Sequence, residues 1–312
     1  MIRLRFGLLL LVVLLPPQLL RAQSWEDWYL HSNGSHLYVT EIGRGDTVVV
    51  LHGGWGGEHS YLLDAIAGLE SDFHFVLYDQ RGSLRSPSTD SLISLDQHVA
   101  DLEALRETLG LDRMMIMAHS MGTFLAMSYL DRYPDRVAGL TLAAAIPAHM
   151  DGLAIHPEAI AFTERPAVNE QISNEGLDVD RIANSKEDSK IWKIRFAAAN
   201  IYRVERWPQL KGGRIFYSEP ANEATTRSMP DSWNFTSRLR EHPYQITVVL
   251  GDHDFADWKG TQWTATAGDL RNVKLVMLEE AGHNAWIDRP TRFAEVLRNA
   301  LSDGRHPMDA TE

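Results

Sequence analysis

Residues 114–130, which read MMIMAHSMGTFLAMSYL, carry the strongest structural signal in the chain. Residues 114–117 form an apolar run typical of a strand buried on both faces, and residues 123–133 read as a helix. Ser120 lies at the corner between the two. A serine on such a strained turn has its hydroxyl pushed clear of the sheet, where it can act as a nucleophile. The stretch therefore predicts a strand, a sharp turn and a helix, with Ser120 exposed at the turn.

The serine corner also has a plainer interpretation. The usual pattern for a nucleophile at this position is Gly-x-Ser-x-Gly, and Ala118 stands at the first glycine. A serine can also simply cap a helix N-terminus, which is a common role. We expect Ser120 to be a nucleophile because later segments of the chain supply the partners that it needs.

Strands and helices alternate on both sides of this corner. Residues 36–42 alternate weakly. Further strands are predicted at residues 47–51, 73–78, 137–146, 246–250 and 273–278, and helices at residues 95–109 and 291–301. This order predicts an α/β fold with a mostly parallel, doubly wound sheet.

Residues 148–241 interrupt the alternation. The segment is long and rich in charged and aromatic residues, and its residues 191–202 look helical. We therefore expect a core in two parts, residues 23–147 and 242–312, with a helical insertion at residues 148–241.

Composition and charge exclude several classes of protein. With 44% hydrophobic and 23% charged residues, the 312-residue chain is neither disordered nor fibrous. Its 30 basic and 42 acidic residues give a net charge of −12, which makes nucleic acid an improbable partner. The chain has no cysteine, so it has no disulfide, no thiol nucleophile and no thiolate metal site.

The first 22 residues have the pattern of a secretory signal peptide. Arg3 and Arg5 precede an apolar run at residues 6–15, and Ala22 supplies a small residue at the cleavage position. We expect a secreted or periplasmic protein without stable membrane association after cleavage. An uncleaved membrane anchor is the alternative, although the apolar run is short for one.

A serine nucleophile needs a base, and the base needs an acid that orients it. His283, in the EAGHN segment after the last strand, is the candidate base, and Asp254, in the LGDHD segment after the preceding strand, is the candidate acid. Asp252 is the rival acid. A metal site at residues 252–254 is disfavoured because adjacent side chains on such a loop diverge.

The glycine-rich segment HGGWGG at residues 52–57 is the candidate oxyanion loop. It follows a strand, and we expect the backbone N–H groups of Gly54 and Met121 to bind the oxyanion of an acyl-transfer reaction. The segment lacks the Gly-Lys-Ser/Thr of a phosphate loop, and His59 stands where a dinucleotide fingerprint has its third glycine. We expect no nucleotide, other cofactor or metal.

Taken together, these segments resemble the α/β-hydrolase superfamily, and within it the proline iminopeptidase (prolyl aminopeptidase) branch of serine peptidases. Residues 52–56 are similar to the family's His-Gly-Gly-Pro-Gly, and residues 79–86, DQRGSLRS, are similar to its Asp-Gln-Arg-Gly-x-Gly-x-Ser turn. The resemblance implies that Ser120, Asp254 and His283 form a catalytic triad. It also implies that the insertion at residues 148–241 is a helical cap over the active site.

The resemblance implies an aminopeptidase that releases the N-terminal residue of a short peptide. The segment AHSMG departs from the aminopeptidases' typical Gly-Gly-Ser-Trp-Gly, and His-Ser-Met-Gly occurs in many esterases and lipases, so hydrolysis of small or medium esters is the alternative. A binding protein that kept the fold without turnover is the third hypothesis. Trp55 and Glu205, an acid of the cap, are the candidate contacts for the small-molecule or short-peptide substrate.

Overall fold

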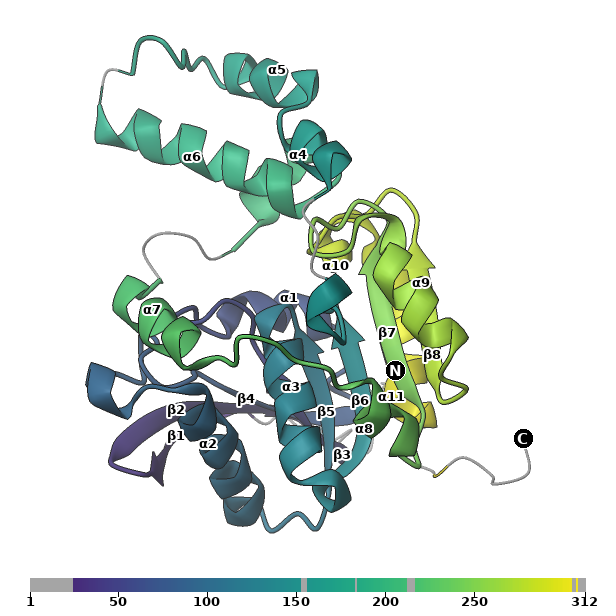
Figure 1. Ribbon diagram of the computed structural model, residues 1–312. Coiled ribbons are helices and arrows are strands. Elements are labelled where there is room, and N and C mark those ends of the chain that lie inside the picture. The colour runs from purple at the N-terminus through teal and green to yellow at the C-terminus, as the bar shows by residue number, and fades with distance from the viewer. Residues whose placement is uncertain (1–24, 153–155, 183, 212–216, 305–306, 308–312) are drawn as a thin grey trace, which may run out of the picture.

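A single mixed sheet forms the centre of the molecule (Figure 1). The computed structural model describes residues 25–152, 156–182, 184–211, 217–304 and 307, so the signal peptide predicted at residues 1–22 lies outside them. Within these residues the strand order is β1-β2-β4-β3-β5-β6-β7-β8. The strands are β1 (Trp25–Ser32), β2 (Ser35–Gly43), β3 (Asp46–Leu51), β4 (Phe73–Tyr78), β5 (Met114–His119), β6 (Val137–Ala143), β7 (Ile246–Gly251) and β8 (Val273–Leu278).

The sheet is parallel from β4 to β8, whereas β1 pairs with β2 and β2 with β4 in antiparallel fashion. Every residue of β5 and of β7 is buried, which explains why these segments read as continuous apolar runs. The predicted α/β fold with a mostly parallel sheet is confirmed.

Helices cover both faces of the sheet. One face packs against α2 (Leu95–Thr108), α3 (Met121–Arg132), α8 (Thr236–Glu241) and α9 (Thr261–Gly268), whose apolar residues share one buried cluster. The opposite face packs against α1 (Leu63–Ile66), α10 (Ala285–Asp288) and α11 (Pro290–Asp303) in a second cluster. The sheet is therefore doubly wound, and the carboxyl ends of its parallel strands meet along one edge.

The segment between β6 and β7 has two parts, a separate lobe and helices that pack against the core. Its first helices, α4 (Pro157–Thr163), α5 (Pro166–Asn174), α6 (Ser185–Asn200) and the 3-10 helix η5 (Val204–Gln209), form a lobe with its own small apolar cluster. In Figure 1 this lobe stands beyond the sheet, whereas α7 (Glu219–Ser228) and α8 lie against the core. The lobe is the only part of the predicted insertion, among the residues described, that stands away from the core.

Capping residues explain where two of the longer helices begin. The side chain of Asn184 accepts hydrogen bonds from the first N–H groups of α6, and Ser94 does the same for α2. None of the helices that the structure describes is both long and apolar enough to cross a membrane.

Candidate active site

Ser120 occupies a strained turn between β5 and α3. Its backbone has φ +53° and ψ −127°, a conformation that costs energy for a residue with a side chain. The neighbours must be small, because a Cβ atom on Gly122 would lie 2.6 Å from the carbonyl oxygen of His52, and one on Gly53 would lie 2.5 Å from the Cβ atom of Ser120. This close approach is what a nucleophile at a strand-to-helix corner requires.

Asp254 and His283 come together from the loops after β7 and β8. The Oδ1 atom of Asp254 lies 2.7 Å from Nδ1 of His283, and the two side chains are 0% and 4% exposed. Because Nδ1 faces the carboxylate, Nε2 is the nitrogen left free to serve a nucleophile. The rival acid Asp252 is engaged elsewhere, with Nδ1 of His253 at 2.6 Å and Nζ of Lys259 at 3.2 Å.

The predicted oxyanion loop is anchored to the turn at residues 79–86. The N–H of Gln80 donates to Nε2 of His52 at 3.0 Å, and the Gln80 amide donates to the His52 carbonyl at 2.8 Å. Gly54 adopts φ +69°, and a Cβ atom there would meet nothing within 4 Å, so its backbone borders open space.

Two backbone N–H groups remain free beside Ser120. Gly53 donates its N–H to Tyr61 Oη at 2.7 Å, but the N–H of Gly54 has no hydrogen-bond partner within the described part of the chain. Met121 opens α3, and the first N–H groups of a helix have no intrahelical acceptor. The structure thus leaves donors at Gly54 and Met121, as the oxyanion prediction requires.

A network of charged side chains joins residues 58 and 59, directly after the oxyanion loop, to the turn at residues 79–86. Asp79 accepts from Nδ1 of His59 at 2.7 Å and from Nε of Arg85 at 2.8 Å, and Arg85 also reaches Glu58 at 2.8 Å. Burial alone raises the pKa of Asp79, but the hydrogen bonds from His59 and Arg85 bring that pKa well below its usual range.

This network includes the one group of three ligand-type side chains, Glu58, His59 and Asp79, found close together among the described residues. The guanidinium of Arg85 already lies against both carboxylates. Both carboxylates are therefore already paired with a protein cation, and His59 is hydrogen-bonded to Asp79, so this donor set does not fit a metal site.

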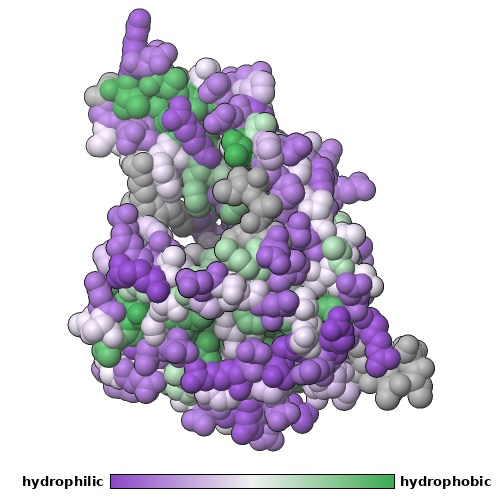
Figure 2. All heavy atoms as spheres, viewed as in Figure 1, coloured by the Kyte–Doolittle hydropathy of each residue, from purple (hydrophilic) through white to green (hydrophobic). Residues whose placement is uncertain are grey.

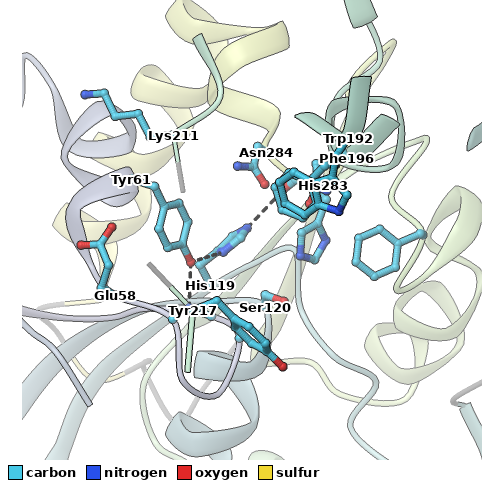
Figure 3. Close-up of a pocket in the computed structure, with 15 residues that line it drawn as sticks. Glu58, Tyr61, His119, Ser120, Trp192, Phe196, Lys211, Tyr217, His283 and Asn284 are labelled. Carbon is cyan, nitrogen blue, oxygen red and sulfur yellow. Dashed lines mark hydrogen bonds between the residues drawn. The ribbon is translucent and has the colours of Figure 1, made fainter. Parts of the chain in front are cut away.

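Ser120 and His283 line the same cavity, which measures about 450 Å³ (Figure 3). Its walls are largely aromatic: Trp192 and Phe196 come from α6, stacked on each other with ring centroids 5.0 Å apart. The ring of Phe255 lies 4.4 Å from that of His283. Figure 2 shows a recess between the α4–α6 lobe and the core. The arrangement places an apolar binding space directly over the serine.

The two predicted substrate contacts are corrected by the structure. Trp55 is 2% exposed and stacks on His98 with centroids 5.4 Å apart, and it does not line the cavity. Its side chain turns into the core beneath the glycine loop. Glu205 is exposed on η5 and does not line the cavity either. Neither residue therefore lies on the wall of the cavity that holds Ser120.

The cavity is lined instead by residues that the sequence analysis did not select. Besides Trp192, Phe196 and Phe255, these include Tyr61 and His119. Burial and the nearby His283 hold the pKa of His119 well below its usual range, so this imidazole is neutral. The sequence could have indicated that His119 lies at the site, because it directly precedes Ser120. Nothing in the sequence pattern of α6 indicates that Trp192 and Phe196 line the cavity.

Comparison with known proteins finds one matching family model and several relatives. The family model described as alpha/beta hydrolase fold matches residues 46–167. A proline iminopeptidase from Heyndrickxia coagulans is 38% identical over 276 residues, covering 84% of this chain and 92% of that protein. A proline iminopeptidase from Saccharolobus solfataricus is 24% identical over 296 residues, covering 88% and 92%.

Solved structures show the same fold with varied functions. A proline iminopeptidase-related protein from Thermus thermophilus is 26% identical, with a TM-score of 0.63 over 90% of this chain and 98% of that one. An esterase from Thermogutta terrifontis is 19% identical, with a TM-score of 0.63 over 90% of this chain and 100% of that one.

Proposed function

Because this chain belongs to the proline iminopeptidase branch of the α/β-hydrolase superfamily and is a hydrolase, we propose that Ser120, His283 and Asp254 are its catalytic triad. One observation carries the proposal: His283 lines the cavity that also holds the strained Ser120, and the buried Asp254 lies 2.7 Å behind it. The chain order of serine, acid and histidine is also that of the superfamily.

In the proposed mechanism, the Ser120 hydroxyl attacks the substrate carbonyl while Nε2 of His283 takes its proton. Asp254 holds the imidazole and stabilises its protonated form. The N–H groups of Gly54 and Met121 bind the oxyanion of the tetrahedral intermediate. His283 then returns the proton to the leaving amine or alcohol. Water next attacks the acyl-enzyme while His283 takes its proton, and His283 passes that proton to Ser120 as the acyl group leaves.

The first candidate substrate is a short peptide or amide with a proline-like N-terminal residue, which the enzyme would release. The names of the relatives support this candidate, and so does the size of the cavity. A space of about 450 Å³ with aromatic walls suits one compact apolar ring better than an extended peptide.

A second candidate, an ester with a small or medium apolar acyl group, is favoured by the charges of the cavity. Among the described residues that line it, Glu58 is the only acid, and its carboxylate already binds Arg85 and Ser60. The internal residues outside the description, 153–155, 183 and 212–216, contain no Asp or Glu. A substrate ammonium would therefore have to compete with Arg85 for its counter-charge.

A three-substrate comparison tests both candidates. L-prolyl-p-nitroanilide, its N-acetylated form and p-nitrophenyl butyrate are compared for kcat/KM, with Ser120→Ala as control. Cleavage of the free-amine anilide alone supports the aminopeptidase. Cleavage of the butyrate with no prolyl activity supports the esterase and removes the aminopeptidase. Hydrolysis that survives in Ser120→Ala would contradict the triad itself.

We also propose that residues 1–22 direct export of the protein. A membrane-impermeant reagent applied to intact cells should label the exported chain. N-terminal sequencing of that chain should begin after Ala22. Protection of the chain from the reagent until the cells are lysed would contradict export.

A further inference from the structure

A continuous chain of hydrogen bonds runs from the oxyanion loop to the main chain of the catalytic histidine (dashed lines in Figure 3). The N–H of Gly53 donates to Tyr61 Oη at 2.7 Å, and that oxygen lies 2.8 Å from Nδ1 of His119. On the other side of the ring, Nε2 of His119 lies 3.2 Å from the carbonyl oxygen of His283. Two side chains, those of Tyr61 and His119, thus connect the segment after β3 with the loops after β5 and β8.

The direction of each bond follows from the chemistry of its atoms. A carbonyl oxygen only accepts, so Nε2 of His119 carries a proton and donates it to His283. Because burial keeps the pKa of His119 well below its usual range, the ring is neutral and its Nδ1 has no proton. The Tyr61 hydroxyl therefore accepts a hydrogen bond from the Gly53 N–H and donates one to Nδ1 of His119. Each donor in this series of hydrogen bonds thus has one acceptor.

Tight aromatic packing holds this bridge in place. The ring of His119 lies 4.8 Å from that of His283 and 5.0 Å from that of Trp286. Trp286 also packs against Tyr61, with centroids 6.1 Å apart. With their rings confined, Tyr61 and His119 have little freedom to lengthen or break the hydrogen bonds.

We infer that Tyr61 and His119 are positioning residues, which hold the oxyanion loop and the His283 main chain at a fixed separation around Ser120. The Tyr61 hydroxyl occupies the Gly53 N–H and so leaves the adjacent Gly54 N–H as the donor that faces the reacting carbonyl. The same bridge limits movement of the His283 backbone, and hence of the imidazole. This inference rests on the proposed triad.

The test is Tyr61→Phe, which removes only the bridging oxygen. Loss of one oxyanion donor typically costs about 10²–10³ in kcat, so misplacing a donor should lower kcat by about 10- to 100-fold. KM should stay within about twofold. Affinity for an alkyl boronic acid, whose adduct with Ser120 places an oxygen in the oxyanion site, should fall in parallel with kcat.

Tyr78→Phe is the matched control. Tyr78 is also a buried tyrosine, 1% exposed, but its hydroxyl has no hydrogen-bond partner among the described residues. The same chemical change at this position should leave kcat within about twofold. A loss of kcat equal to that of Tyr61→Phe would show that any buried hydroxyl matters, and would overturn the inference.

Variants of His119 provide a rescue experiment. His119→Gln keeps one donor and one acceptor on a planar side chain and should recover most of the activity that His119→Leu loses. The double variant Tyr61→Phe with His119→Leu should cost less than the sum of the single changes, because both break the same chain. If His119→Leu does not fold, Tyr61→Phe and Tyr78→Phe decide the question.

Two results separate this inference from the proposed function. A wild-type chain that does not react with a fluorophosphonate at Ser120 would overturn both. An active wild type whose Tyr61→Phe variant keeps its kcat, or loses activity only through KM, would overturn the positioning role and leave the triad intact.

Discussion

The carboxyl edge of the sheet and the α4–α6 lobe face each other across the cavity, but they are built differently. At the sheet edge, Ser120, Asp254 and His283 are fixed by buried strands, strained turns and direct hydrogen bonds. The lobe rests on a small cluster of six buried residues and contributes mainly apolar rings to the cavity.

The polar contacts that join the lobe to the core gather on residues 280–288, which follow β8. The carboxylate of Asp288 accepts from the N–H groups of Tyr202 and Arg203, at 2.7 and 3.1 Å. The rings of Phe162 and His253 meet with centroids 4.6 Å apart. Because α6 supplies apolar rings to the cavity, we infer that the lobe governs the choice of substrate and the sheet edge the reaction chemistry. Three of the four changes below test that division, and the remaining one tests the stability of the core.

The largest effect is expected at the nucleophile. Ser120→Ala removes the attacking oxygen, and loss of a triad serine can cost on the order of 10⁶ in kcat. Hydrolysis of the best substrate should fall to the background rate, with circular dichroism unchanged. Residual activity within about tenfold of the wild type would place the chemistry elsewhere in the molecule.

The next effect distinguishes the two acids of the loop after β7. Asp254→Asn should lower kcat by roughly 10⁴, because an amide next to His283 favours the wrong imidazole tautomer. Asp252→Asn is the matched control, and since Asp252 pairs with His253 and Lys259, kcat should change by less than about threefold. Equal losses would mean that the rival acid shares the role.

A third change concerns stability in the core. Burial lowers the pKa of His242 to about 4, from about 6.5 in the unfolded chain. Between pH 4 and 6.5 this histidine is protonated in the unfolded state but not in the folded state. The free energy of unfolding therefore falls as the pH drops from 6.5 to 4, by roughly 3 kcal/mol at most. Denaturant titrations across this range should show the loss.

Two variants isolate that contribution. His242→Leu should flatten the pH dependence of the unfolding free energy by about one proton. His31→Gln, a change at an exposed histidine on the edge strand, should leave the slope unaltered. An unchanged slope in His242→Leu would show that other buried groups, such as His98, account for the loss at low pH.

The smallest effect is expected in the lobe. Trp192→Ala removes part of the apolar wall and should raise KM by about 5- to 20-fold, equivalent to about 1–2 kcal/mol, with kcat within about threefold. Trp25→Ala, at a tryptophan that is 54% exposed on β1, is the control and should change neither constant. A fall in kcat comparable to that of Asp254→Asn would break the division between chemistry and selection.

Local periodicity predicted most of the fold. The strands expected at residues 73–78 and 273–278 have these same bounds in the structure, and the helix predicted at 95–109 ends one residue earlier. Strand β1 was not predicted because it is an edge strand: most of its residues are exposed, and it has no apolar run. Helix α1, four residues long, was too short to leave a periodic signal.

The predicted site residues whose backbone a motif fixes lie on or beside the cavity, whereas those whose side-chain direction depends on packing do not line it. The sequence segments placed Ser120, Asp254 and His283 in loops that follow predicted strands, and the structure brings Asp254 and His283 into contact. Trp55 was misplaced because the direction of its side chain depends on the core that His98 helps to form beneath the loop.

Local sequence was thus enough to specify the α/β fold, the strained serine turn and the glycine loop, because each depends on periodicity or on the backbone freedom of nearby residues. Packing of the whole chain was needed to select which acid meets His283, which rings line the cavity and how Tyr61 and His119 connect the oxyanion loop to His283. The hydrogen bonds of Asp254 with His283, of Tyr61 with His119 and of His119 with His283 join residues 29 to 164 positions apart. Their geometry follows from how the entire core assembles, which no local pattern encodes.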